Sequence, residues 1–214
     1  GLEPNLDIHA NETANTFYPW YRFINQNASS GHALLWNPLE GVGTPFMAQW
    51  RTRVFSPFTI PFHLFPMELA LRLSVMLKLI VAGWCAYYTA RRFGLSPSLG
   101  LFVGVACQFC GPVYLWPLHP MAAALPWFPL LLLGAERFLL GQMRTWPLMA
   151  IAIALMAFGG DPETLIASIV FVALYLLIRR LRNREWAHFG LDFAALSISL
   201  CMGLALIAVQ LFPY

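Results

Sequence analysis

Carboxylates, arginines and histidines gather in a polar stretch at the start of the chain and in two short stretches further along. They are Asp7, Glu12, His32, Glu40, Arg51, Arg53, His63, His119, Asp161 and Glu163. A carboxylate among them could act as general base toward a hydroxyl group, and an arginine could neutralise a phosphate. Each group could equally serve only to solvate an exposed loop. The sequence therefore offers acid–base and phosphate-binding groups and leaves their use open.

Four titratable positions, one of them a lysine not named above, lie at or inside apolar runs. Asp161 and Glu163 flank Pro162 between two short runs, where acidic groups are costly if they face lipid. Capping of the next helix, with Pro162 in its first turn, is the alternative use of Asp161. His119 could orient a phosphate or lie at a membrane interface. Lys78 stands deep in an apolar run, where we expect it to point into a helical bundle.

Composition indicates the solvent in which these groups must be positioned. Of the 214 residues, 59% are hydrophobic and 11% are charged, whereas roughly a quarter of the residues of a soluble domain are charged. A soluble core of this size cannot hide that excess, so lipid is the expected solvent. The net charge of +3 is small and its basic residues form short clusters, which argues against a nucleic-acid partner. The four cysteines lie in apolar runs; Cys107 and Cys110 form a C-x-x-C, but no second pair and no nearby histidine pair completes a zinc site, so no metal ligands are predicted.

Two regions follow from the distribution of apolar residues. Residues 1–66 contain no run of the ~20 residues that cross a bilayer, and their prolines predict short helices joined by turns. One such helix, over residues 15–26, has an apolar face that suits a helix lying on the membrane. Residues 67–214 predict a polytopic helical bundle with about six spans. The spans are expected at 68–90, 97–116, 121–140, 145–159, 162–179 and 189–212. The fold class is thus an all-α integral membrane protein with an N-terminal non-cytoplasmic segment.

Basic residues predict the orientation of this bundle. They cluster after the first, third and fifth expected spans, at Arg91, Arg92, Arg137, Arg144, Arg179, Arg180, Arg182 and Arg184. By the positive-inside rule those loops are cytoplasmic, and residues 1–66, 116–120 and 159–163 share the other side. The chain also opens at Gly1 and stops soon after an apolar run. We therefore expect further spans before and after it.

Four sequence blocks together resemble one family. They are NETANTFYPWYRF, GHALLWNPLEGVGTPFMAQWRTRVFSPFTIPFHLFP, PLHP and GGDPET, in that order. The chain resembles, over nearly its whole length, the bacterial YfhO-like membrane proteins of the GT-C glycosyltransferase superfamily. The block over residues 36–66 is its most specific part.

The resemblance implies an enzyme of the bacterial cytoplasmic membrane that moves a sugar from a polyprenyl-phosphate carrier to a glycan or lipid acceptor on the outer face. The family's acidic base before the Tyr-Pro-Trp element corresponds to Glu12, with Asp7 as the alternative, and Asp161 replaces the family's histidine in Gly-Gly-His-Pro. A divalent metal ion could assist through the carboxylates. The predicted substrate-binding residues are Tyr18, Trp20, Trp36, Asn37, Arg51, Arg53, His119, Asp161 and Glu163. A transporter or flippase and a non-catalytic envelope-assembly protein are the alternatives.

Overall fold

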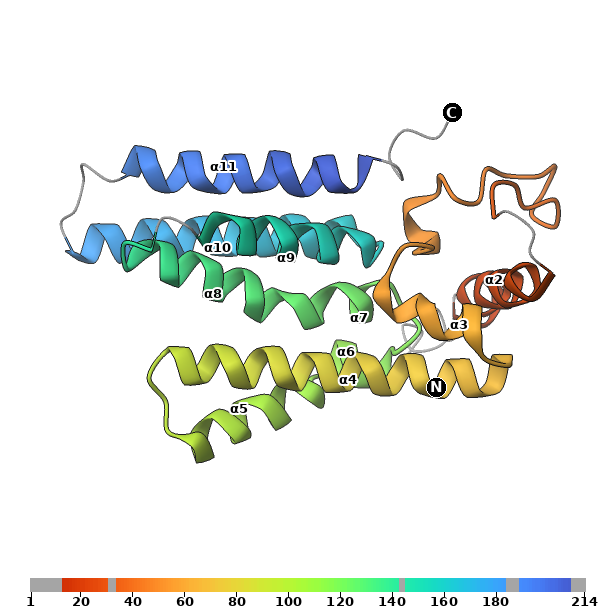
Figure 1. Cartoon of the computed structure of the whole chain (residues 1–214), viewed down its shortest axis with the longest axis horizontal. Coiled ribbons are helices and arrows are strands. Elements are labelled where there is room, and N and C mark those ends of the chain that lie inside the picture. The colour runs from red at the N-terminus through yellow and green to blue at the C-terminus, as the bar shows by residue number, and fades with distance from the viewer. Residues whose placement is uncertain (1–12, 31–33, 143–144, 184–188, 209–214) are drawn as a thin grey trace, which may run out of the picture.

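The computed structural model describes residues 13–30, 34–142, 145–183 and 189–208 (Figure 1). Within these ranges the regular structure is helical, apart from one isolated backbone bridge between Asn37 and Thr44. Three helical stretches of the described chain are long and apolar enough to cross a membrane: Met67–Arg92, Met121–Leu139 and Pro162–Asn183. An all-helical chain of this kind supports the prediction of a multi-pass membrane protein.

The N-terminal segment, residues 1–66, folds over its described part into short helices joined by turns, as its prolines predicted. These elements are a π-helical turn at Thr13–Phe17, α2 (Tyr18–Ser30), two 3-10 turns at Trp50–Thr52 and Pro57–Thr59, and α3 (Ile60–Leu64). Its core is mainly aromatic and consists of Phe17, Trp20, Tyr21, Phe23, Phe46 and Phe62, together with Ile24 and with Ala70 of the next helix. Asn25 of α2 donates to the carbonyls of Phe62 and Phe65 at 2.8 and 2.7 Å and so ties α2 to α3.

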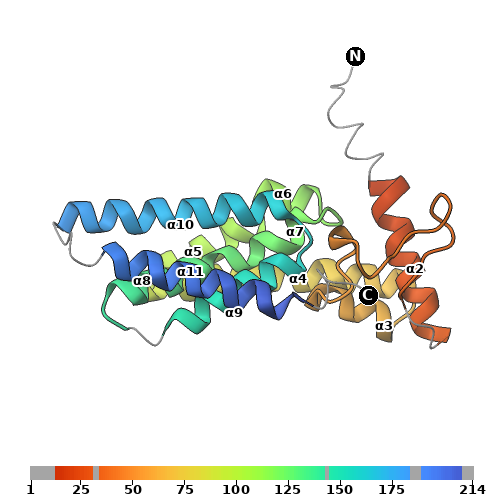
Figure 2. The ribbon, with the colours of Figure 1, turned by 90° about the horizontal axis from the view of Figure 1, so that it is seen from above.

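Helix α2 corrects one prediction. We expected the apolar face of a helix over residues 15–26 to lie on lipid, but Phe17, Trp20, Tyr21 and Ile24 are buried against protein. The ring of Tyr21 stacks on Phe62 with 4.2 Å between centroids. Figure 2 shows α2 lying across the direction of the bundle helices. The expected amphipathic helix therefore exists, and its apolar face closes the core of the N-terminal segment.

The described residues from 67 to 208 form the helical bundle. Its helices are α4 (Met67–Arg92), α5 (Pro97–Gln108), α6 (Gly111–Leu115), α7 (Met121–Ala124), α8 (Phe128–Leu139), α9 (Trp146–Phe158), α10 (Pro162–Asn183) and α11 (Phe189–Leu206), with a 3-10 turn at Leu125–Trp127 between α7 and α8. Helices lie at the six places where spans were expected, but among the described residues only the three stretches named above are long and apolar enough to cross a membrane; α5, α9 and α11 are shorter apolar helices. The expected span 97–116 is not one helix, because α5 ends at Gln108 and the separate α6 begins at Gly111, with Pro112 in its first turn.

Helix α4 joins the two regions. With 26 residues it is about 39 Å long, which exceeds the ~30 Å of a hydrocarbon core. Its first turns pack under the N-terminal segment, where Ser74 donates to the carbonyl of Phe58 at 2.7 Å, and its remainder runs along the bundle (Figure 1). The N-terminal segment thus sits on one end of the bundle and α4 fixes it there.

The opposite end of the bundle is held by ion pairs. Arg180 of α10 makes two hydrogen bonds to Asp192 of α11, at 2.7 and 3.0 Å, and both residues are buried. Glu136 of α8 accepts hydrogen bonds from Tyr175 at 2.5 Å and from Arg179 at 2.7 Å. The arginines predicted to be cytoplasmic therefore include residues that lock helices together at the end remote from the N-terminal segment.

Candidate functional site

Arg53 lies where the N-terminal segment meets the bundle. It follows the turn Trp50–Thr52 with a left-handed backbone, φ 57°, and its own carbonyl accepts hydrogen bonds from Ser56 N at 3.0 Å and Thr59 Oγ1 at 2.7 Å. Its side chain is only 1% exposed. The guanidinium donates from Nη1 to the carbonyl of Leu118 at 2.8 Å and from Nε to that of Arg51 at 3.1 Å. Arg53 therefore joins two segments that are 65 residues apart in the chain.

Two aromatic rings flank this guanidinium. Its central carbon lies 5.1 Å from the ring centroid of Phe17 and 4.9 Å from that of Tyr21, distances at which cation–π attraction operates. Burial lowers the pKa of Arg53, while the nearby Tyr21 and Asp161 act in the opposite direction. Burial also raises the pKa of the Tyr21 hydroxyl, an effect that the charge of Arg53 partly offsets. A cation is thus held in an environment with little water.

Lys78 of α4 supplies a second buried cation at this place. Its side chain is 1% exposed, and Nζ donates to the carbonyl of Pro117 at 2.6 Å. The ammonium lies 5.9 Å from the centroid of Tyr21, the ring that also flanks Arg53. Lys78 and Arg53 therefore bind the consecutive carbonyls of Pro117 and Leu118, so they fix the short stretch between α6 and α7.

His119 follows directly after those two carbonyls. Its Nδ1 accepts a hydrogen bond from the backbone N–H of Met121 at 3.2 Å, and its ring meets Phe17 edge-on with 5.4 Å between centroids. The imidazole is half-buried and comes from the stretch that the two cations hold. Its position is therefore set by Arg53 and Lys78 through the backbone.

Asp161 enters from the junction between α9 and α10. It is 3% exposed, and its Oδ2 accepts hydrogen bonds from the backbone N–H of Thr164, at 3.2 Å, and from the Thr164 hydroxyl. This is the helix-capping role that the sequence left open. The preceding Gly160 packs so closely on Arg53 that a Cβ there would lie 2.6 Å from Arg53 Cγ. The α9–α10 connection thus brings a carboxylate close to Arg53. Among the described residues, Asp161 and Arg53 do not form an ion pair.

We call Tyr21, Arg53, Lys78, His119 and Asp161 the junction site. It contains two buried cations and one buried carboxylate, which is engaged in capping. Buried charges are stable only when paired or fully hydrogen-bonded, and within the described residues neither Arg53 nor Lys78 forms a salt bridge. The site therefore has an electrostatic preference for an anion, and phosphate is the common anion that such cations recognise.

The remaining predicted site residues are distributed over other places. Trp20 and Asn37 line a small pocket on the other flank of α2, together with Glu40. Four of the predicted residues are exposed: Tyr18, Trp36, Arg51 and Glu163. Of these, Arg51 contributes its backbone carbonyl, which accepts a hydrogen bond from Arg53 Nε. Both predicted catalytic carboxylates, Asp7 and Glu12, lie outside the described residues. Among those described, no group of three or more His, Cys, Asp or Glu is arranged to hold a metal ion.

Lys78 and Tyr21 belong to the junction site but were not among the predicted substrate-binding residues. A signal for Lys78 existed, since an isolated lysine inside an apolar run must find a partner. Tyr21 gave no such signal, because its helical spacing with Phe17 and Ile24 is that of an ordinary core residue.

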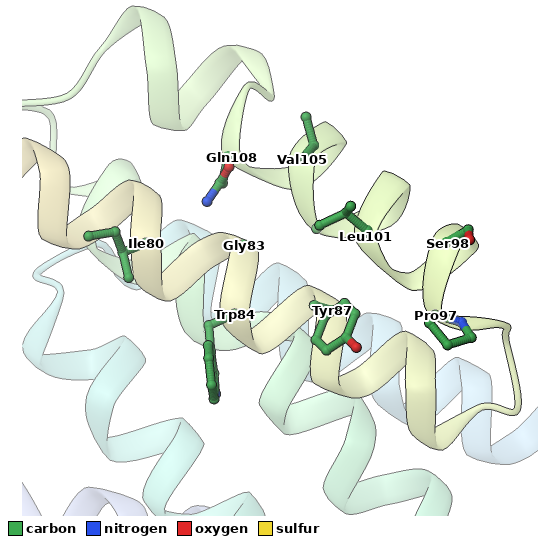
Figure 3. Close-up of a pocket in the computed structure, with 10 residues that line it drawn as sticks. Ile80, Gly83, Trp84, Tyr87, Pro97, Ser98, Leu101, Val105 and Gln108 are labelled. Carbon is green, nitrogen blue, oxygen red and sulfur yellow. The ribbon is translucent and has the colours of Figure 1, made fainter.

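A larger cavity of about 560 Å³ lies between α4 and α5 (Figure 3). The residues that form it include Gly83, Trp84, Tyr87, Leu101, Val105 and Gln108. Gly83 and Gly104 allow the helices to approach closely, because a Cβ on Gly104 would lie 2.9 Å from the carbonyl oxygen of Gly83. The lining contains no carboxylate, histidine or cation, and at 100° per residue its α4 positions face away from Lys78. This cavity therefore stands apart from the junction site.

Comparisons with protein-family models, with curated proteins and with solved structures gave no significant match.

Proposed function

We propose that this protein is a GT-C-type membrane glycosyltransferase of the YfhO-like kind, which moves a sugar from a polyprenyl-phosphate carrier to a cell-envelope acceptor. In this proposal six helical passes lie in the bacterial cytoplasmic membrane and residues 1–66 lie on its outer face. The support is the motif resemblance together with a junction site whose cations suit a phosphate.

The pair of buried cations carries the proposal. Arg53 and Lys78 lie at the end of the bundle that bears the N-terminal segment, where a lipid-linked substrate would present its phosphate. Their side chains are occupied by carbonyls, so they act through positive potential and by holding the stretch that contains His119. A preorganised positive potential favours the charge that develops on a departing phosphate.

The reaction requires a base as well as this potential. The acceptor hydroxyl would attack the anomeric carbon of the sugar while a carboxylate, Asp7 or Glu12, takes its proton. The bond between that carbon and the phosphate oxygen breaks, and polyprenyl phosphate leaves with the bonding electron pair. Arg51 is exposed next to the site, and in this proposal it contacts the phosphate directly.

The packing around Gly159 and Gly160 bears on the alternative of a transporter. A transport pathway at this junction would need space, but a Cβ on Gly159 would lie 2.7 Å from Ala124 N and one on Gly160 would lie 2.9 Å from the carbonyl oxygen of Trp50. This close packing favours an enzyme over a pathway through the junction.

The test uses the protein in membranes with a panel of radiolabelled polyprenyl-phosphate sugars. We expect Lys78→Gln to raise KM for the donor about tenfold or more, since loss of a buried cation removes more than 1.4 kcal/mol of attraction for phosphate. Arg72→Gln is the matched control, because Arg72 is an exposed cation on the same helix. Asp7→Ala and Glu12→Ala identify the base by loss of kcat.

Two outcomes would oppose the proposal. Absence of transfer by the wild type across the donor panel would favour transport or an assembly role. Equal effects of Lys78→Gln and Arg72→Gln on KM would remove the junction site from donor binding.

A further inference from the structure

A second polar feature of the N-terminal segment is a pocket between α2 and the turn over residues 37–44. Asn37 and Thr44 pair through two backbone hydrogen bonds of 2.8 and 3.0 Å. Gly41 and Gly43 take positive φ values of 61° and 96°, which lets the chain reverse in this short turn. The turn brings Glu40 against α2, where Trp20 Nε1 donates to Glu40 Oε2 at 3.2 Å. The resulting pocket has a volume of about 160 Å³.

Its polar groups keep unused hydrogen-bonding capacity. Asn37 is 5% exposed, and in the described part of the chain its side chain uses only Oδ1, which accepts from Leu39 N at 3.0 Å. Both N–H donors of this amide therefore remain for another partner. Glu40 accepts from Trp20 and from the Thr44 hydroxyl through the same oxygen, Oε2. In the described part of the chain the Asn37 nitrogen is not among the side-chain atoms buried without a partner, so water reaches it through the pocket, and a polar ligand would replace that water.

The chemistry of the lining narrows the class of ligand. Asn15, Thr16, Asn37 and Glu40 supply donors and acceptors, while Trp20 and Phe23 supply apolar walls. A sugar ring presents this same combination, with hydroxyl groups at its rim and C–H groups on its faces. The volume holds about five water molecules at ~30 Å³ each, which is roughly the room of a single sugar ring. The carboxylate of Glu40 disfavours an anionic ligand.

We propose that this pocket binds one neutral sugar residue. The identification of that sugar as part of the acceptor glycan rests on the proposed function, whereas its binding does not require transfer. Phe17 lies between the two places, since its ring meets Trp20 edge-on at 5.8 Å and lies 5.1 Å from the guanidinium carbon of Arg53. An acceptor held here would therefore approach the junction site from across α2.

Binding is measured without any donor lipid, by saturation-transfer NMR on the protein in nanodiscs. The probes are the methyl glycosides of a neutral hexose, of an N-acetylhexosamine and of glucuronic acid, with empty nanodiscs as background. Asn37→Asp keeps the oxygen that accepts from Leu39 and removes both free donors. We expect the neutral glycoside to bind about tenfold or more weakly to this variant, since two hydrogen bonds of ~1 kcal/mol each are lost.

A second variant guards against a change in the turn itself. Asn15→Trp fills the mouth of the pocket from an exposed position and should abolish saturation transfer. Val42→Ser is the control, because Val42 is fully exposed on the same turn and does not line the pocket; it should bind like the wild type.

Three results would overturn the inference: no saturation of any neutral glycoside, preference for the glucuronide, or unchanged binding by both Asn37→Asp and Asn15→Trp. Binding here without transfer in the donor assay would overturn the proposed function alone. Transfer without binding here would overturn the pocket alone.

Discussion

Gly160 offers the sharpest test of how the N-terminal segment is seated on the bundle. Its φ of 78° is in the left-handed region, and a Cβ added there would lie 2.6 Å from Arg53 Cγ, 2.9 Å from the Trp50 carbonyl oxygen and 3.2 Å from Arg51 Cα. Two of these three atoms are backbone and cannot move aside alone. The substitution Gly160→Ala must therefore displace the stretch that carries Arg53.

The expected loss in the free energy of unfolding on Gly160→Ala has two parts. The left-handed backbone costs alanine roughly 1–2 kcal/mol, and overpacking of a filled site adds about 1–3 kcal/mol. Gly141 provides the matched control, because its φ is 83° and a Cβ there meets nothing within 4 Å. Gly141→Ala therefore loses stability only through the backbone part. The difference between the two variants is then the contact part, about 1–3 kcal/mol.

Thermal unfolding of the purified protein in detergent, followed by circular dichroism, measures this difference. At ~2–4 °C per kcal/mol for a chain of this size, Gly160→Ala should melt about 2–12 °C below Gly141→Ala. Limited proteolysis should also cut Gly160→Ala faster near residues 50–53. Equal melting temperatures for the two variants would refute the close packing of Gly160 on Arg53.

Two further predictions concern titration and topology. Burial raises the pKa of Tyr21 in the folded protein, so above pH ~10 the unfolded state loses this proton first and the free energy of unfolding falls by up to ~1.4 kcal/mol per pH unit. Tyr21→Phe should flatten this decline in denaturant titrations, and the exposed Tyr18→Phe is the control. An unchanged slope would argue against a buried neutral hydroxyl. For topology, a membrane-impermeant maleimide should label Glu163→Cys in intact cells and should label Arg182→Cys only after permeabilisation. Both positions are exposed in the structure. The reverse labelling pattern would mean that the orientation is inverted.

The helical passes could be predicted from the sequence because hydropathy over about 20 residues is a local property. In the part of the chain that the structure describes, the runs starting near residues 67, 121 and 162 form three helical stretches that are long and apolar enough to cross a membrane. The interruption after Gln108 was missed, although Pro112 carried its signal, since an apolar run across a proline still satisfies a length criterion.

The site was only partly predictable, because it depends on contacts between segments that are far apart in the chain. The sequence predicted Arg53, His119 and Asp161 as site residues, because charged and polar side chains beside apolar runs are costly unless they have a partner or a function. It could not tell that Arg53 is buried between Phe17 and Tyr21 while Arg51, two residues earlier, is exposed. That distinction depends on a left-handed turn and on a carbonyl 65 residues away.

The sequence by itself thus determined the helical character of the apolar runs, and it predicted lipid as their surroundings and a division at about residue 66. Only the tertiary structure decided which cations meet, because the contacts of Lys78 with Pro117 and of Arg53 with Leu118 join segments 39 and 65 residues apart. It also decided that Glu40 and Asn37 line a pocket against α2. Apolar periodicity reports what each segment buries, but the partner that covers it is chosen by packing across the whole chain.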